Sequence, residues 1–289
     1  MRALALVVLA HVALVLAACS RAEVRESAGT RASESWVAMS FNVRYGSADD
    51  GPDAWPLRRD DLLARIRQQA PTMLGVQEAL DFQVEWLGSE LPGHVRIGQG
   101  REGGARGEHC ALFLERARFE VLASGDFWLS ERPDEVGSVG WDAALPRICT
   151  WARVRERATG REFTAWNAHF DHRGEVARER SGQLLASRIL AFRGEHVVLG
   201  DFNCGETSPA LRALAAAGLR DTFRDVPHGT DHVGTFHAFR GGSAGEKIDF
   251  VLATQGLRTV SAAILSEPGA RGRWPSDHHA VVAALVWRE

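Results

Sequence analysis

Lysine and tyrosine are nearly absent from this chain. Its 289 residues include one lysine, Lys247, and one tyrosine, Tyr45, so almost all of its 34 basic residues are arginines. The formal net charge of −3 excludes a strongly basic surface that coats nucleic acid, although a local basic groove stays compatible with it. Arginine suits bidentate contacts to phosphate, but a GC-rich genome accounts for the same bias.

Cysteine is also scarce. Four cysteines are present, and one of them, Cys19, belongs to the N-terminal segment described below. The remaining three, Cys110, Cys149 and Cys204, are an odd number, which excludes a complete disulfide framework, and their spacings match no zinc pattern. A single disulfide and buried free thiols are both compatible with an exported protein.

The N-terminus carries the chain's one long apolar run. Residues 3–18 are too few for a comfortable transmembrane helix and match a secretory signal. The run ends in Leu16-Ala17-Ala18-Cys19, which resembles the bacterial lipobox; an ordinary signal peptide is the alternative. We therefore expect a signal peptide at 1–18, a lipidated Cys19 with a flexible tether to residue 35, and a domain at 36–289. Position 20 is serine, so the usual inner-membrane retention signal is missing, and we expect a lipid-anchored protein of the bacterial cell envelope.

From residue 36 onward, segments of strand and helix length alternate. Helices are predicted where apolar side chains recur every three or four residues, at 57–69, 82–91, 174–192 and after Ser208-Pro209. Strands are predicted at 36–43, 72–77, 109–114, 118–122, 126–129, 150–156, 162–167, 197–199, 235–239, 248–253, 260–265 and 280–287. Because strands both alternate with helices and follow one another, we expect one monomeric α/β domain with two packed mixed sheets flanked by helices.

Polar clusters lie at the ends of six apolar segments. They are Ser40-Phe41-Asn42, Val76-Gln77-Glu78, Asn167-Ala168-His169, Gly200-Asp201-Phe202-Asn203, Lys247-Ile248-Asp249 and Ser276-Asp277-His278. Their side chains are almost all metal ligands or proton carriers, which indicates one composite active site. Each cluster also has a structural explanation of its own: Glu78 as a helix N-terminal acid, Asp201 and Asn203 as a tight turn, and His278 as a core histidine.

Together the clusters suit hydrolysis of a phosphate ester. Anionic phosphate oxygens repel nucleophiles, so catalysis needs a cation, hydrogen-bond donors and a group that orients or deprotonates water. Carboxylates such as Glu78 favour a hard ion, with Mg²⁺ expected and Mn²⁺ or Ca²⁺ as alternatives. His169 and His172 lie three residues apart, a spacing compatible with zinc, but the carboxylates around them favour the harder ion.

Six strings carry a resemblance to a known superfamily. They are Phe41-Asn42-Val43, Gln77-Glu78, Asn167-Ala168-His169, Gly200-Asp201-Phe202-Asn203, Ile248-Asp249 and Ser276-Asp277-His278. Over residues 36–289 their order and spacing resemble the endonuclease/exonuclease/phosphatase superfamily. The resemblance implies a four-layer α/β/β/α sandwich, deoxyribonuclease-I-like, and metal-dependent phosphoester hydrolysis. The strings Trp55-Pro56-Leu57-Arg58 and Gly234-Thr235-Phe236-His237 are typical of an uncharacterised bacterial branch.

The resemblance also implies residue roles. Metal ligands would be Glu78, Asp277 and Asn42; catalytic residues would be His278, Asp201, Asn203, Asp249 and His169. We expect Arg147, Asn167, Arg44, His172 and His237 to bind phosphate or substrate. Arg44 departs from the abasic-site endonucleases, which have an acid at that position, and the tyrosine those enzymes use is missing.

The substrate stays open at this stage. The resemblance allows a nuclease, which we favour, or a lipid phosphodiesterase similar to sphingomyelinases; a phosphatase is a further option. A nuclease would need an arginine-lined groove, for which residues 96–108 and 147–161 are candidates. A lipid enzyme would need exposed apolar loops, for which residues 127–129 and Trp141 are candidates. A non-catalytic phosphate-binding module is disfavoured because no core acid or histidine position is lost.

Overall fold

The computed structural model describes residues 35–229 and 233–289, of which Val37–Glu289 form one compact unit. The predicted signal peptide, Cys19 and nearly all of the predicted tether lie outside the described residues, so those assignments stay predictions. Within the described part of the chain, no helix is both long and apolar enough to cross a membrane. Cys110, Cys149 and Cys204 are free thiols.

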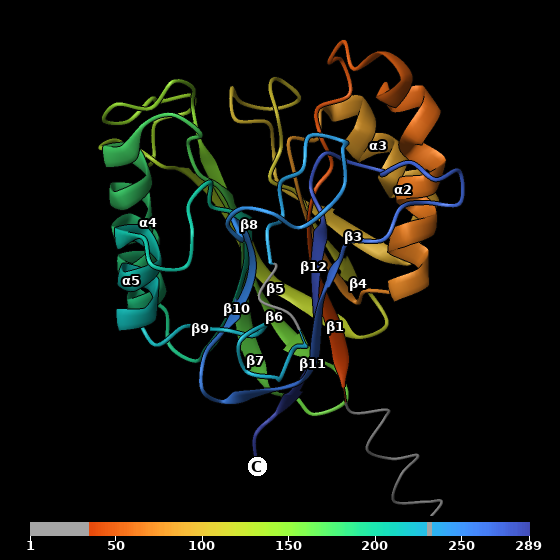
Figure 1. Ribbon diagram of the computed structural model, residues 1–289. Coiled ribbons are helices and arrows are strands. Elements are labelled where there is room, and N and C mark those ends of the chain that lie inside the picture. The colour runs from red at the N-terminus through yellow and green to blue at the C-terminus, as the bar shows by residue number, and fades with distance from the viewer. Residues whose placement is uncertain (1–34, 230–232) are drawn as a thin grey trace, which may run out of the picture. The chain divides into compact units, whose positions relative to one another are not determined.

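Two six-stranded mixed sheets form the centre of this unit (Figure 1). The first has the strand order β11 (Leu257–Leu265), β12 (Ala280–Trp287), β1 (Trp36–Asn42), β2 (Met73–Gln77), β4 (Leu112–Glu115), β3 (His94–Ile97). The second has the order β5 (Phe119–Trp128), β6 (Ile148–Glu156), β7 (Glu162–His169), β8 (Glu195–Asp201), β10 (Asp249–Ala253), β9 (Arg220–Asp221). A short 3₁₀ helix, η1, spans Gly51–Asp53.

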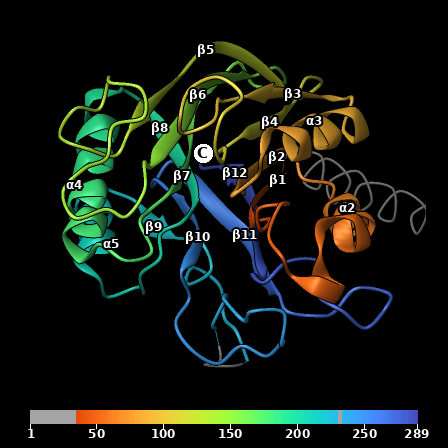
Figure 2. The same ribbon diagram turned by 90° about the horizontal axis from the view of Figure 1, so that it is seen from above.

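Four helices cover the outer faces of the two sheets, which confirms the four-layer α/β/β/α sandwich (Figure 2). Helices α2 (Trp55–Gln69) and α3 (Asp81–Glu90) pack on the first sheet, and α4 (Glu175–Ala191) and α5 (Pro209–Ala216) pack on the second. Helix α2 ends at Gln69, as predicted, and the next residue, Ala70, is left-handed (φ 44°) and precedes Pro71. Ser208 caps α5 by accepting a hydrogen bond from the backbone N–H of Leu211.

Three predicted strands differ from the structure. The two strands expected at 118–122 and 126–129 are one strand, β5, with an irregular register between Val121 and Ala123. A β-bulge interrupts the apolar alternation without ending the strand, so the sequence pattern reads as two. The strand expected at 235–239 is wrong: within it, Phe236 forms an isolated bridge to His278, and Ala238 and Phe239 have positive φ.

The strand register brings the polar clusters to one edge. β1 and β2 are parallel, with Asn42 opposite Gln77, and β7 and β8 are parallel, with His169 opposite Asp201. All four are the last residues of their strands. β10 runs antiparallel to β8 and begins with Asp249 opposite Asp201. The carboxyl ends of both parallel pairs therefore meet the start of β10, the kind of position where α/β sheets bind ligands.

Candidate active site

At this edge the two sheets enclose a cavity of about 640 Å³. Most of the predicted catalytic and metal-binding side chains line it: Glu78, His169, Asp201, Asn203, Asp277 and His278. Arg44, Arg147 and His172, predicted to bind phosphate, line it as well. The cavity thus combines carboxylates, histidines and arginines from both sheets, which are the groups that phosphate chemistry requires.

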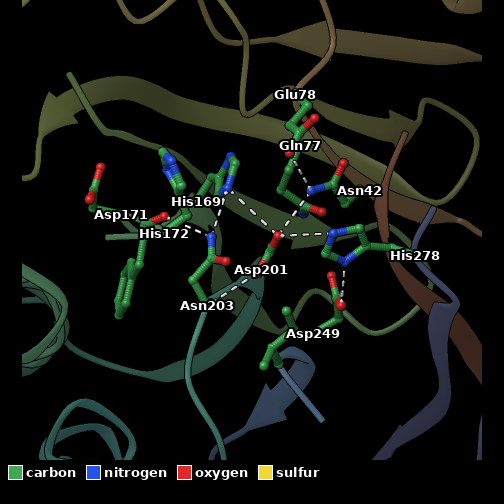
Figure 3. Close-up of polar contacts among 12 residues, drawn as sticks. Asn42, Gln77, Glu78, His169, Asp171, His172, Asp201, Asn203, Asp249 and His278 are labelled. Atoms are coloured by element: carbon green, nitrogen blue, oxygen red, sulfur yellow. Dashed lines mark hydrogen bonds and ion pairs between the residues drawn. The ribbon is translucent and has the colours of Figure 1, made fainter. Parts of the chain in front are cut away.

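Asp201, at the end of β8, lies at the centre of the site (Figure 3). Its Oδ2 accepts a hydrogen bond from Asn42 Nδ2 (2.9 Å), and its Oδ1 accepts one from the backbone N–H of Asn203 (2.9 Å). The same Oδ2 is 3.6 Å from His169 Nε2 and 3.8 Å from His278 Nε2. One buried carboxylate therefore faces both histidines, a position from which it can hold a water molecule between them.

His278 and Asp249 form a buried pair. His278 Nδ1 donates to Asp249 Oδ2 over 2.9 Å, which directs Nε2 toward Asp201. Burial alone lowers the pKa of His278, but the charges of Asp249 and Asp201 outweigh burial and raise that pKa well above its ordinary value. Burial, with the charge of Asp249, raises the pKa of Asp201 to about 7. The imidazolium can accordingly donate a proton or a hydrogen bond from Nε2.

Glu78 and Asp277 form the acidic end of the cavity. Glu78 Oε2 accepts from the backbone N–H of Tyr45 (3.2 Å), and its Oε1 accepts from Asn42 Nδ2 (3.0 Å). Burial raises the pKa of Asp277, and the negative charge of Glu78 adds to the shift. A divalent cation between such carboxylates would relieve this repulsion, so the oxygen donors present fit the expected hard ion.

Asn42, predicted as an oxygen ligand of the metal, presents its side-chain nitrogen to the two carboxylates of the site. Its Oδ1 accepts from the backbone N–H of Arg44 (2.9 Å), so its Nδ2 points toward Glu78 and Asp201 and donates to both. Asn42 therefore bridges the two carboxylates and fixes their spacing. The donor orientation is set by the Arg44 N–H, which can bond only to the carbonyl oxygen.

Arg44 lies beside this acidic end. It donates two hydrogen bonds to Asp50 (3.1 and 2.8 Å), and its NH1 is 3.8 Å from Asp277 Oδ2. Its backbone is left-handed (φ 57°), as are those of Glu78 (φ 62°) and Asn203 (φ 50°). Non-glycine residues adopt this conformation only where their surroundings enforce it, and here all three line the cavity.

Arg147 holds the two histidines of the Asn167–His172 segment. Its NH1 lies 3.1 and 3.2 Å from the ring nitrogens of His169, and its NH2 donates to His172 Nδ1 (2.8 Å). Asn203 Nδ2 donates to both Phe170 O and His169 Nε2 (3.0 Å each). His169 Nε2 must therefore accept, which makes the ring neutral. Burial and Arg147 agree with this, since both lower the pKa of His169 well below its ordinary value.

Asp171 anchors Arg147 from behind. Its Oδ2 accepts from Arg147 Nε (3.2 Å), and its Oδ1 accepts from the backbone N–H groups of Arg173 (2.9 Å) and Gly174 (2.8 Å). Burial would raise the pKa of Asp171, but the backbone hydrogen bonds outweigh it and lower that pKa to about 2. Because Arg147 is already bonded to three side chains, it orients the histidines as well as facing the cavity. His169 and His172 both accept from an arginine, which does not favour the zinc alternative.

Two predicted substrate-binding residues lie away from the cavity lining. Asn167 is fully buried between the sheets, where its Nδ2 donates to Val76 O and Ala111 O and its Oδ1 accepts from Gln77 Nε2 (2.7 Å). Its polar atoms are used to join the two sheets, so the predicted contact with phosphate is not supported. His237 stacks on His279, with ring centroids 4.0 Å apart, and burial lowers its pKa to about 3.

Several residues of the site were not predicted. Arg101 and Glu108, from the glycine-rich loop, line the cavity and pair over 2.7 Å, and Glu108 Oε2 is 4.0 Å from His169 Nδ1. Phe236 lines it as well, with its ring centroid 5.0 Å from that of His278. Arg101 belongs to residues 96–108, which we expected as a candidate arginine-lined groove, whereas no sequence signal singled out Glu108 or Phe236.

Arg58 of α2 is a further unpredicted contributor. It is buried, pairs with no carboxylate in the part of the chain that the structure describes, and donates to four backbone carbonyls, those of Val43, Arg44, Asp53 and Pro275. These carbonyls belong to the loop after β1 and the loop before β12. Arg58 thus ties the segment that carries Arg44 to the segment that carries Asp277.

The sequence model of the Endonuclease/Exonuclease/phosphatase family matches residues 39–278, which span the cavity-lining strands and loops. The chain belongs to this family. No sequence among the curated proteins matches it.

Solved members of the endonuclease/exonuclease/phosphatase family share its fold. A family protein from Bacteroides vulgatus is 35% identical, with a TM-score of 0.82, over 88% of this chain and 99% of that one. A mannosyl-6-phosphatase from Bacteroides thetaiotaomicron is 31% identical, with a TM-score of 0.82, over 87% of this chain and all of that one (100%). TDP2 from D. rerio, solved with a single-strand DNA product, is 14% identical with a TM-score of 0.67, over 87% of this chain and 98% of that one; this likeness concerns the fold alone.

Proposed function

We propose that the protein is a divalent-metal-dependent phosphoesterase that hydrolyses the phosphate ester of a small polar alcohol. The observation that carries the proposal is the position of Asp201, whose buried carboxylate faces His278 Nε2 at 3.8 Å and is joined to Glu78 through Asn42. This arrangement places a water-handling acid between a cationic histidine and a set of oxygen ligands.

Each residue then has a separate task. Glu78 and Asp277 would hold the cation, which supplies charge neutralisation at the phosphate oxygens when bound. Asp201 orients the attacking water and accepts its proton. His278 Nε2 stabilises the charge that develops on the phosphate oxygens, and Asp249 keeps its Nδ1 protonated. Asn203 Nδ2, fixed by Phe170 O, holds His169 in its neutral form beside the phosphate.

The contacts of the arginines favour a small substrate over an extended nucleic acid. In the segments expected to form a nuclease groove, only Arg101 and Arg147 line the cavity. Arg153 and Arg155 instead pair with Glu162. A cavity of about 640 Å³ is of the size that small-molecule sites have.

The lipid alternative loses three of its four expected residues, and the fourth, Trp141, is partly buried. Phe127, Trp128 and Leu129 are at most 3% exposed and belong to the core, so they form no apolar surface for a membrane. The 31%-identical mannosyl-6-phosphatase supports a phosphomonoester as the first substrate to test.

The proposal is tested by hydrolysis assays on the domain from residue 36. A hexose 6-phosphate, single-stranded DNA and a choline phosphodiester lipid are offered with Mg²⁺, and again with a chelator. We expect the monoester to be hydrolysed in a chelator-sensitive reaction, and Asp201→Asn to lower kcat at least about a hundredfold.

Asp134→Asn is the matched control, because the Asp134 side chain is 85% exposed and should leave kcat unchanged. If the metal-loaded protein is inert toward all three substrates, or if Asp201→Asn is as active as the wild type, the proposal is wrong. If DNA or the lipid is hydrolysed faster than the hexose 6-phosphate, the proposed substrate class is wrong, while the proposed phosphoester hydrolysis still holds.

A further inference from the structure

Phe236 is an exposed aromatic residue on a fixed backbone at the cavity. Its side chain is 48% exposed although its backbone forms a bridge to His278. On either side, Thr235 O accepts from the His279 N–H (2.7 Å) and the His237 N–H donates to Asp277 O (2.9 Å). These hydrogen bonds hold the backbone of Phe236 against the segment that carries His278, so the exposed ring stays at the cavity, where a ligand can contact it.

Because the Phe236 ring lies in the proposed active-site cavity, the ligand that contacts it would be the substrate. Among the described residues, the exposed large apolar side chains that line the cavity are Phe236 and Leu145, the latter 37% exposed. The Phe236 ring lies 5.0 Å from the His278 ring at an interplanar angle of 59°. A phosphate held by His278 would thus bring its alcohol portion next to Phe236.

Apart from Tyr45 and Ile248, the remaining lining of the cavity is polar. Arg101, Glu108 and His172 contribute to it, and Arg101 Nε is buried with no hydrogen-bond partner among the described residues. Arg101 NH1 donates to Glu108 Oε2 (2.7 Å). The alcohol portion would therefore meet apolar carbon at Phe236, and donors and acceptors at Arg101, Glu108 and His172.

We propose that Phe236 binds the apolar C–H face of a sugar ring in the leaving group, while the ring hydroxyls bond to the polar lining. This inference rests on the proposed phosphoesterase activity and names its substrate class as phosphorylated sugars in ring form. A pyranose has both an apolar C–H face and a rim of hydroxyls, as the mixed lining requires. An acyclic polyol lacks the flat face, and a lipid tail lacks the hydroxyls.

The test compares phosphomonoesters that share the phosphate group and differ in the alcohol that leaves. kcat/KM is measured for a hexose 6-phosphate, glycerol 3-phosphate and a deoxynucleoside 5′-monophosphate, in the wild type and in Phe236→Ala. Removing the ring should lower kcat/KM for the hexose phosphate about 10- to 50-fold, the range expected for a lost apolar contact in a binding pocket. The value for glycerol phosphate should fall less than about threefold, and Phe236→Trp should restore the preference for the sugar.

Phe82→Ala is the matched control, because Phe82 is 49% exposed on α3 and does not line the cavity. It should leave all three values unchanged. An equal loss for all substrates in Phe236→Ala would show that the ring only supports His278 and would overturn the inference. A larger loss for the nucleotide than for the hexose would assign the ring to a base and overturn the sugar class. If the wild type hydrolyses none of the three, the proposed function fails first.

Discussion

Single residues of this site are held by neighbours that leave them little freedom. Asp201 receives hydrogen bonds from Asn42 and from the Asn203 backbone, which use one lone pair on each oxygen. Arg44, Glu78 and Asn203 have left-handed backbones at the cavity. Such conformations cost on the order of 1–3 kcal/mol each, and the fold sustains them because the side chains must point into the site.

Asp171 gives a prediction for pH dependence. Its pKa in the folded protein is about 2, below the ordinary value of 3.8, so its ionised form stabilises the fold above about pH 4. This contribution, about 1–2 kcal/mol after allowance for solvent screening, should be lost as the pH falls from 4 toward 2. The measurement is the free energy of unfolding of the wild type and of Asp171→Asn between pH 6 and pH 2.5.

The quantity to compare is the difference in unfolding free energy between the wild type and Asp171→Asn at each pH. The other carboxylates titrate in both proteins, so their effects cancel in this difference. We expect the wild type to have the larger free energy of unfolding at pH 6, and its advantage over Asp171→Asn to shrink toward pH 2.5. If the difference in unfolding free energy between the two proteins stays constant over this pH range, folding does not lower the pKa of Asp171 and the prediction is wrong. Asp134→Asn, at an exposed site, should show no difference from the wild type at any pH.

At the scale of elements, the site depends on how the two sheets face each other. β2 carries Gly75 against β7 and β8, where a Cβ atom would come within 2.8 Å of Leu199 Cδ1 and 2.9 Å of Asn167 Cγ. The glycine thus lets the sheets approach closely enough for Gln77 to donate to Asn167 over 2.7 Å. Buried amides here link the layers that bear Glu78 and His169.

Gly75→Ala should therefore destabilise the protein. The added methyl group meets side chains in a packed interior, and overpacking of this kind costs about 1–3 kcal/mol. The same substitution at Gly88 is the matched control, since nothing lies within 4 Å of its Cβ position in α3. There alanine should stabilise the helix by about 0.5–1 kcal/mol. Chemical denaturation of the three proteins measures both effects, and a neutral Gly75→Ala would contradict the close approach of the sheets.

For the whole molecule, the acidic end of the cavity predicts that a cation stabilises the fold. Burial and Glu78 raise the pKa of Asp277, so the folded protein gains when a divalent ion binds there. At Mg²⁺ concentrations a hundredfold above Kd, the gain is about 2.7 kcal/mol. We expect Tm to rise with Mg²⁺ in the wild type and to stay unchanged in Glu78→Gln.

Glu135→Gln is the control for this prediction, because Glu135 is an exposed acid paired with Arg132. It should keep the full response to Mg²⁺. The idea of a cation held by Glu78 is wrong if Glu78→Gln responds like the wild type. This measurement needs no substrate, so it is independent of the activity assays.

Much of the architecture follows from local sequence. Buried runs such as β8 and capped helices such as α5, with Ser208 and Pro209 at its start, have patterns that local physics enforces. The exceptions lack such patterns. β5 contains a bulge that breaks its alternation, and the predicted strand at 235–239 was replaced by turns with positive φ. In both segments the backbone conformation depends on hydrogen-bond partners that lie far away in the sequence.

The amino-acid sequence alone indicated which chemistry-bearing residues belong to one site, among them Glu78, Asp201 and His278, because their positions at strand ends are local and their order resembles that of a known superfamily. It did not determine the orientation of Asn42, the sheet-joining role of Asn167 or the presence of Glu108 and Phe236 in the cavity. Those depend on contacts between segments separated by many residues. Hydrogen bonds and close packing across the two sheets have no local signature, so only the tertiary structure decided them.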